Sequence, residues 1–211
     1  MTKPKVKEPG AGDDAGVEGN ARLTSSTGTL LLVMLAVEGF TVLGVRQLIT
    51  LHVFLGVMLL GPVLLKTGST LYRFARYYRG APAYVRKGPP HPVLRLLGPL
   101  VILLSLVLLG TGVGLLAVSP EQAGLLRTVH KLSFFAWFAA MTVHVVGHVR
   151  EAAVGTWHEV RPVAGDPASR RRGLRTAAVG LALLAGVGTA TALLPTATPW
   201  LQNGQHGNGG R

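Results

Sequence analysis

The chain alternates between long apolar runs and shorter polar or basic segments. Five apolar runs, at about residues 29–49, 51–71, 93–118, 125–149 and 174–194, are long enough to cross a hydrocarbon layer of about 30 Å as helices. The last run is rich in Ala, Gly and Thr, which suit close helix packing in lipid. The pattern therefore predicts an all-α integral membrane bundle of five transmembrane helices, with the lipid bilayer as its surroundings.

The polar segments define the rest of the organisation. Residues 1–27 are rich in Lys, Gly, Asp and Glu and lack apolar periodicity, which predicts a disordered cytoplasmic tail before a bundle at 28–196. The end of the chain, 197–211, is predicted to be a flexible extracytoplasmic tail. The basic segments 73–95 and 150–172 carry several Pro and Gly residues and are predicted to be loops. No loop is long enough for a separate catalytic domain.

The positive charge is distributed in a way that predicts topology. The formal net charge is +12, but Lys and Arg sit between apolar runs that no nucleic-acid-binding domain would carry. The N-terminal tail and the segments after the second and fourth helices hold sixteen Lys and Arg residues, and the opposite side holds four. Because cytoplasmic loops are enriched in Lys and Arg, the N-terminus is expected inside and the C-terminus outside, in a multi-pass protein of the plasma membrane.

Ionisable groups inside the predicted spans are the candidates for chemistry, since they are costly there. His52 begins the second helix and His130 begins the fourth, and both helices run from outside to inside, so the two imidazoles are expected at similar depth. One imidazole from each of two helices at matched height is how a bundle holds haem iron. The sequence has no cysteine, so a haem would be bound non-covalently. The six candidates are Glu38, His52, Lys66, His130, His144 and His148.

Helical periodicity adds a second level of candidates. His144 lies fourteen residues after His130 and His148 eighteen, which places all three on one face, with His144 about 21 Å from His130 along the axis. The same fourteen-residue step from His52 reaches Lys66. The two helices therefore both carry histidine near their outer ends, at His52 and His130. Fourteen residues further in, one carries Lys66 and the other His144.

The segments 51–56 (LHVFLG), 130–133 (HKLS) and 141–144 (MTVH) resemble the haem-binding helices of the membrane cytochrome b superfamily, including bacterial b561-like and hydrogenase-type b subunits. In diheme members each helix supplies two ligands. The resemblance implies one outer haem b with His52 and His130 as axial ligands, and Lys66 in place of a ligand puts the inner haem in doubt. It also implies that Gly56 lets the porphyrin approach its helix.

Three cations lie on the outer side, where the propionates of an outer haem would emerge: Arg46, Arg127 and Lys131. They could pair with those carboxylates or anchor the helices at the interface.

The remaining groups keep several interpretations. His144 could belong to a second haem site with Lys66, bind a metal with His148 as an i, i+4 pair, or hydrogen-bond within the bundle, which is the interpretation favoured for His148. Lys66 could extend to the headgroups. Glu38 is expected to be protonated, hydrogen-bonded or paired with a cation such as Lys66.

Three functions fit these residues. The first is a b-type haem protein that passes electrons between the quinone pool and a partner oxidoreductase, and it would act as an electron-transfer subunit without catalysing a reaction alone. The second is a metal or ion carrier that uses the histidines of the fourth helix. The third is a structural or regulatory membrane protein without a cofactor.

Overall fold

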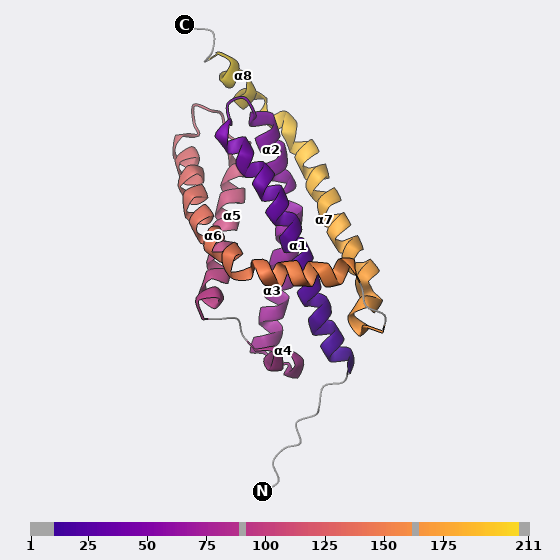
Figure 1. The fold of residues 1–211 in the computed structure, drawn as a ribbon. Coiled ribbons are helices and arrows are strands. Elements are labelled where there is room, and N and C mark those ends of the chain that lie inside the picture. The colour runs from indigo at the N-terminus through magenta and orange to yellow at the C-terminus, as the bar shows by residue number, and fades with distance from the viewer. Residues whose placement is uncertain (1–10, 89–91, 162–164, 207–211) are drawn as a thin grey trace.

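The structure, a computed structural model, describes residues 11–88, 92–161 and 165–206 (Figure 1), and these are helical apart from short turns. Five stretches are long and apolar enough to cross a membrane: Asp14–Leu43, Ile49–Tyr78, Arg95–Leu115, Gly124–Val160 and Pro167–Gln202. The predicted all-α fold is confirmed, with five helices that are long and apolar enough to span a membrane.

The helices follow one another with short connections. Their bounds are α1 Ala11–Leu43, α2 Ile49–Met58, α3 Leu60–Tyr78, α4 Pro82–Lys87, α5 Pro92–Leu115, α6 Gly124–Val160, α7 Arg172–Leu193 and α8 Thr198–His206, with 3₁₀ turns η1 Pro167–Arg171 and η2 Leu194–Ala197. α5 packs mainly on α6, and α7 packs on α2 and α3, while α1 contacts α6 and α3.

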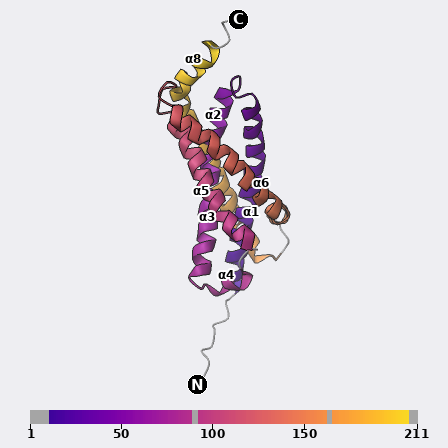
Figure 2. The same ribbon diagram turned by 90° about the vertical axis from the view of Figure 1, so that its left-hand side faces the viewer.

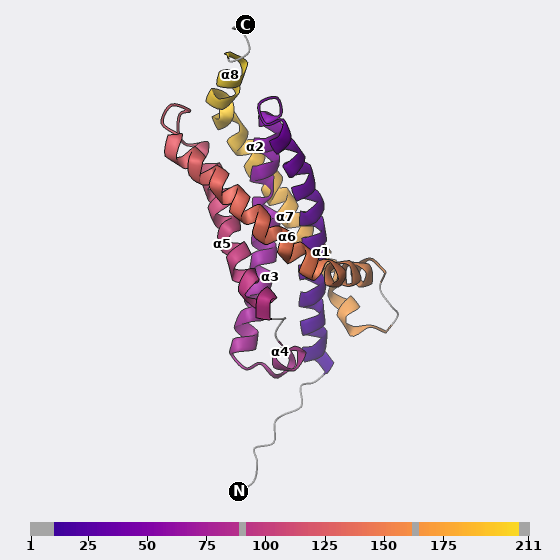
Figure 3. The same ribbon diagram turned by 60° about the vertical axis from the view of Figure 1, so that its left-hand side comes forward.

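The two ends of the bundle carry different elements (Figures 1–3). One end, the α8 end, holds α8, the turn at residues 44–48 and the connection between α5 and α6. The other, the α4 end, holds α4, the start of α1 and the end of α3. α2, α3 and α6 all run from the α8 end towards the α4 end, and the last part of α6 turns to cross α1.

α1 is longer than the sequence pattern suggested. It has 33 residues, or about 50 Å of helix, so it extends well beyond a hydrocarbon layer of about 30 Å. Residues 11–27, predicted to be part of a disordered tail, are helical because they have packing partners: Val17 is buried against Ala83 and Tyr84 of α4. The rest of that predicted tail, residues 1–10, lies outside the described residues.

Other boundaries also differ from the predicted loops and tail. α3 continues to Tyr78 and α6 to Val160, into segments predicted to be loops. At the end of the chain, α8 occupies much of the predicted flexible tail, and Trp200 donates its indole N–H to the Leu115 carbonyl at 2.9 Å. Residues 207–211 lie outside the described residues.

A proline and two glycines let α2, α3 and α7 approach closely. Pro62 has no N–H, so the Met58 carbonyl one turn earlier lacks its helical donor and α2 gives way to α3 at Leu59. A Cβ added to Gly186 of α7 would lie 2.2 Å from that Met58 oxygen, and one added to Gly61 would lie 1.9 Å from the Ala182 oxygen. The small residues of α7 therefore form a helix-packing seam, as the Ala-, Gly- and Thr-rich composition of the last predicted span suggested.

Candidate functional site

The two histidines that begin α2 and α6 both lie towards the α8 end of the bundle. His52 is the fourth residue of α2 and His130 the seventh of α6, and the two helices run in the same direction (Figures 1 and 3). Both imidazoles line one cavity. The structure thus places the two residues that the sequence paired on the wall of the same cavity.

His52 is held by side chains of α1. Its Nδ1 lies 2.9 Å from Glu38 Oε1 and 2.9 Å from Thr41 Oγ1. Thr41 is fully buried, and its hydroxyl lies 2.6 Å from the Glu38 carbonyl oxygen and 3.3 Å from Glu38 Oε2. The carboxylate and the hydroxyl therefore orient the His52 ring from the neighbouring helix.

His130 is held in a similar way by α5. Its Nδ1 lies 3.1 Å from the Leu108 carbonyl oxygen and 3.0 Å from Thr111 Oγ1. The Thr111 hydroxyl also donates to the backbone of its own helix, at 2.7 Å from the Val107 oxygen. Each ring is therefore contacted by one oxygen acceptor and one threonine hydroxyl. The acceptor is a carboxylate at His52 and a backbone carbonyl at His130.

The two rings share one arrangement of their nitrogens. Within the described part of the chain, every hydrogen bond to the imidazole ring of His52 or His130 involves Nδ1, which leaves Nε2 of each ring available. Histidines that ligate a metal commonly donate their second ring N–H to a carboxylate or a backbone carbonyl, which fixes the ring and its tautomer. The pair has this supporting shell on both sides.

Two glycines make room for these contacts. A Cβ at Gly112 of α5 would lie 3.2 Å from His130 Cε1, and a Cβ at Gly56 of α2 would lie 3.2 Å from Glu38 Oε1. Gly56 thus admits the carboxylate that holds His52, in addition to the approach of a porphyrin expected from the sequence. Gly112 has the corresponding place beside His130.

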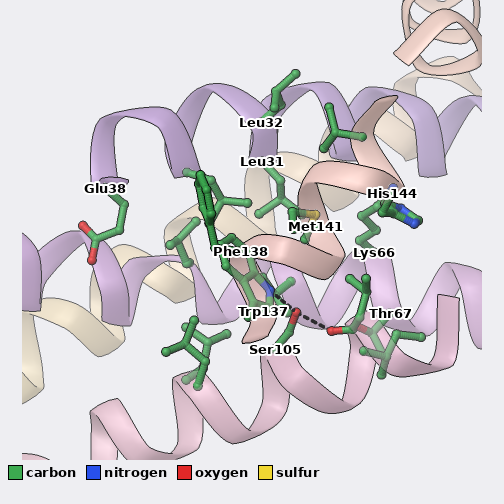
Figure 4. A pocket seen from close by; sticks show the side chains of 18 of the residues that line it. Leu31, Leu32, Glu38, Lys66, Thr67, Ser105, Trp137, Phe138, Met141 and His144 are labelled. Atoms are coloured by element: carbon green, nitrogen blue, oxygen red, sulfur yellow. Dashed lines mark hydrogen bonds between the residues drawn. The ribbon is translucent and has the colours of Figure 1, made fainter. Parts of the chain in front are cut away.

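The cavity is large and mostly apolar. Its volume is about 2330 Å³, whereas pockets for single small molecules occupy about 300–1000 Å³. Figure 4 shows Glu38 at one side of the view, His144 beside Lys66 at the other, and Leu31, Phe138 and Met141 between them. Trp137 closes part of the wall, where its indole N–H donates to Ser105 Oγ at 2.9 Å.

The three cations predicted to lie on the outer side, Arg46, Arg127 and Lys131, line the same cavity. The Arg127 guanidinium is partly engaged, because it lies 5.0 Å from the centre of the Trp200 ring and donates to the Pro120 carbonyl at 3.0 Å. Arg46 and Lys131 have exposed side chains at this end.

Glu38 and Lys66 have separate partners. Glu38 contacts His52, whereas Lys66 Nζ donates to the Thr24 carbonyl oxygen at 3.0 Å, in a notch where a Cβ at Gly28 would lie 2.7 Å from Nζ. The Glu38 carboxylate is thus hydrogen-bonded, which is one of the three possibilities expected from the sequence. Its partner is His52 and not Lys66.

The other two candidate histidines, His144 and His148, lie one turn apart on α6 with ring centres separated by 4.7 Å. His148 Nδ1 lies 3.1 Å from Glu151 Oε2, in line with the hydrogen-bonding interpretation favoured from the sequence. His144 Nδ1 is buried without a hydrogen-bond partner in the described structure. Among the described residues, no group of three or more His, Cys, Asp or Glu side chains could hold a metal ion.

The supporting residues Thr41, Thr111, Leu108 and Gly112 were not singled out from the sequence. A usable signal existed for the two threonines, because a hydroxyl in an apolar helix needs a partner and Thr41 follows Glu38 by three residues. The Leu108 carbonyl has no sequence signal, since its role depends on how α5 and α6 are packed.

In comparisons with protein-family models, curated proteins and solved structures, nothing matches this chain.

Proposed function

We propose that this chain is a b-type haem protein of the membrane that transfers electrons, with one haem held between His52 and His130. The observation that carries the proposal is the paired arrangement of the two rings. Each has Nδ1 engaged by an oxygen acceptor and Nε2 available, and both line one apolar cavity. Two neutral, oriented imidazoles from facing helices are the ligand set that haem iron requires.

The surroundings of the pair also fit the group. Apolar side chains would surround the porphyrin, and Arg46, Arg127 and Lys131 would pair with its propionates. A bound haem supplies a reversible one-electron couple. The protein contributes the orientation of the two rings, and the Glu38 carboxylate makes the His52 imidazole a more basic ligand.

The orientation in the membrane is part of the proposal. The cations Arg73, Arg76, Arg79, Arg86 and Lys87 follow one another through the end of α3 and α4, at the end where α1 begins. With the excess of Lys and Arg on cytoplasmic segments, this α4 end faces the cytoplasm of a plasma membrane and the haem lies near the outer face. The proposed electron partners are the quinone pool and an oxidoreductase subunit, which would perform the substrate chemistry.

The test is the spectrum of protein purified from haem-replete cells. We expect a reduced-minus-oxidised α band of a b haem with one haem per chain, and its loss in His52→Ala and in His130→Ala. His158→Ala is the matched control, because this histidine is exposed near the end of α6 and should leave the band unchanged. A colourless wild-type protein, or full haem content in both ligand variants, would rule the proposal out.

A further inference from the structure

The cavity continues beyond the haem site to a polar cluster towards the α4 end. Lys66 lies fourteen residues, or about 21 Å, from His52 along α2 and α3, and His144 lies as far from His130 along α6. Lys66 and His144 line the cavity side by side (Figure 4). At about 2330 Å³ the cavity is larger than the roughly 300–1000 Å³ of a pocket for a single small molecule, so its inner part extends beyond the room that one cofactor needs.

The inner part of the cavity has unused polar groups. His144 Nδ1 is buried without a hydrogen-bond partner in the described structure. Lys66 Nζ makes one hydrogen bond, to the Thr24 carbonyl, although an ammonium has three donors. Two donors of Lys66 and one buried nitrogen of His144 are therefore available to a ligand.

The charge of this region is positive. Lys66, Arg73 and Lys87 line the cavity together with one carboxylate, Glu151, which already contacts His148. Lys87 is 3.7 Å from Glu18, whereas Lys66 and Arg73 make no ion pair within the part of the chain that the structure describes. The ligand that complements this region carries negative charge.

The wall of the cavity between α1 and α6 is apolar and open. Leu32 of α1 and Phe138 and Val146 of α6 line it, and their side chains are 42% to 73% exposed. In a membrane such exposed apolar side chains face acyl chains. A molecule could therefore enter this part of the cavity sideways from the lipid.

We propose that the inner part of the cavity binds one anionic phospholipid, with its phosphate at Lys66 and Arg73 and its acyl chains between α1 and α6. The site combines a cationic floor with an apolar, lipid-facing wall, and this matches an anionic head joined to long hydrocarbon chains. The floor lies about 21 Å from the level of His52, near the opposite boundary of a hydrocarbon layer of about 30 Å, where lipid phosphates lie. The site uses none of the residues of the proposed haem site.

The test is native mass spectrometry of the purified full chain in neutral detergent, with phosphatidylglycerol and phosphatidylcholine of the same acyl chains added in equal amounts. We expect one phosphatidylglycerol to remain bound at collision energies that remove phosphatidylcholine. The double variant Lys66→Gln with Arg73→Gln should bind phosphatidylglycerol about tenfold more weakly, the effect of losing a charge-assisted contact. Arg46→Gln, at the other end of the cavity, is the charge-matched control and should bind like the wild type.

Two further variants separate this site from others. Leu32→Trp, which adds bulk to the α1 wall of the inner part of the cavity, should weaken binding while the Lys66 and Arg73 head site is intact. His52→Ala should retain the phospholipid, so loss of haem and loss of lipid can be told apart. Equal retention of both lipids, or unchanged binding in the double variant, would overturn the proposal. Two haems per chain with one lost in His144→Ala would also overturn it, because a porphyrin would then fill the inner space.

Discussion

Glu38 Oε1 lies 2.9 Å from Nδ1 of His52, so a carboxylate inside the first helix meets the imidazole that begins the second. The side chain of Glu38 is only 12% exposed, and the fully buried Thr41 contacts both residues. A carboxylate in a membrane bundle is costly unless it is paired, and here its partner is the ring that it orients. This contact makes α1 part of the proposed haem site, although α1 supplies none of its proposed ligands.

If His52 holds a haem as proposed, removing this carboxylate should weaken haem binding. Loss of the group that supports a ligating histidine commonly costs about tenfold to a hundredfold in metal affinity. We expect Glu38→Ala to lower haem affinity by about this factor in titrations of the apoprotein. Glu38→Gln should retain more affinity and raise the midpoint potential, because a neutral amide stabilises ferric iron less than a carboxylate does.

The control for Glu38 is on the other ring. Thr111→Val removes a hydroxyl from His130 but leaves the Leu108 carbonyl at 3.1 Å, so its effect on haem affinity should be much smaller. If Thr111→Val and Glu38→Ala lowered the affinity equally, the carboxylate would have no special part in holding its ring.

Gly112 provides a steric test of the His130 position. A Cβ at Gly112 would already lie 3.2 Å from His130 Cε1, so the branched side chain in Gly112→Val must displace the ring. We expect most of the haem absorbance to be lost at unchanged expression. Gly110→Val on the same helix is the matched control, since a Cβ at Gly110 meets nothing within 4 Å, and it should keep the spectrum of the wild type. Similar spectra for the two variants would count against the placement of His130.

The sequence predicted what depends on one helix at a time. Apolar length located five spans, and the matched starts of two helices paired His52 with His130. The hydrogen-bond partners of these rings could not be predicted, because Leu108 and Glu38 reach them only through the packing of α5 on α6 and α1 on α2. Tertiary contacts likewise extend α1 to residue 11, where Val17 packs on α4 despite a polar sequence.

Gly186 should be essential for stability rather than for the haem site. Its Cα faces the Met58 carbonyl, and a Cβ there would lie 2.2 Å from that oxygen, so Gly186→Leu must separate α7 from α2. Overpacking of this kind typically costs about 1–3 kcal/mol. SDS titration or thermal denaturation should show this loss. Gly188→Leu is the control, since a Cβ at Gly188 meets nothing within 4 Å, and equal stabilities of the two variants would contradict the predicted seam.

The contact between α1 and η1 should depend on pH through Asp166. Its Oδ2 lies 2.6 Å from the Arg22 guanidinium and its Oδ1 accepts the Ala168 N–H, and these bonds lower the pKa of the Asp166 carboxyl. A lowered pKa means that the stabilisation is present at neutral pH and is lost as the pH falls through the lowered value, below about 4. Hydrogen exchange in η1 should therefore accelerate in acid.

Two variants isolate that carboxyl. Asp166→Asn should exchange faster in η1 at neutral pH and lose the acid dependence. Glu18→Gln removes the other carboxylate that pairs with Arg22, at 3.2 Å, but leaves the contact between Arg22 and Asp166 intact. This variant should therefore keep both the slow exchange in η1 and its pH dependence. An unchanged acid response in Asp166→Asn would assign the titration to a different group.

The buried pair of Glu159 and Arg175 should contribute more to stability than the exposed ion pairs among the described residues. Both guanidinium nitrogens that face Glu159 are bonded, at 3.0 and 2.7 Å, and the side chains are only 9% and 10% exposed. Arg175 also donates to the Ala168 carbonyl at 2.9 Å, so it joins the end of α6, η1 and the start of α7. Glu159→Gln leaves this cation buried without its counter-charge.

Breaking one side of a buried pair typically costs about 3–5 kcal/mol, whereas an exposed pair contributes less than about 1 kcal/mol. Asp14→Asn, which breaks the contact with Arg86 between side chains 58% and 53% exposed, is therefore the control. We expect SDS unfolding to separate the two variants clearly. Because the pair fixes where α6 ends against α7, Glu159→Gln should also increase hydrogen exchange in the last turns of α6. A stability loss as small as that of Asp14→Asn would mean that water reaches Arg175 and replaces the carboxylate.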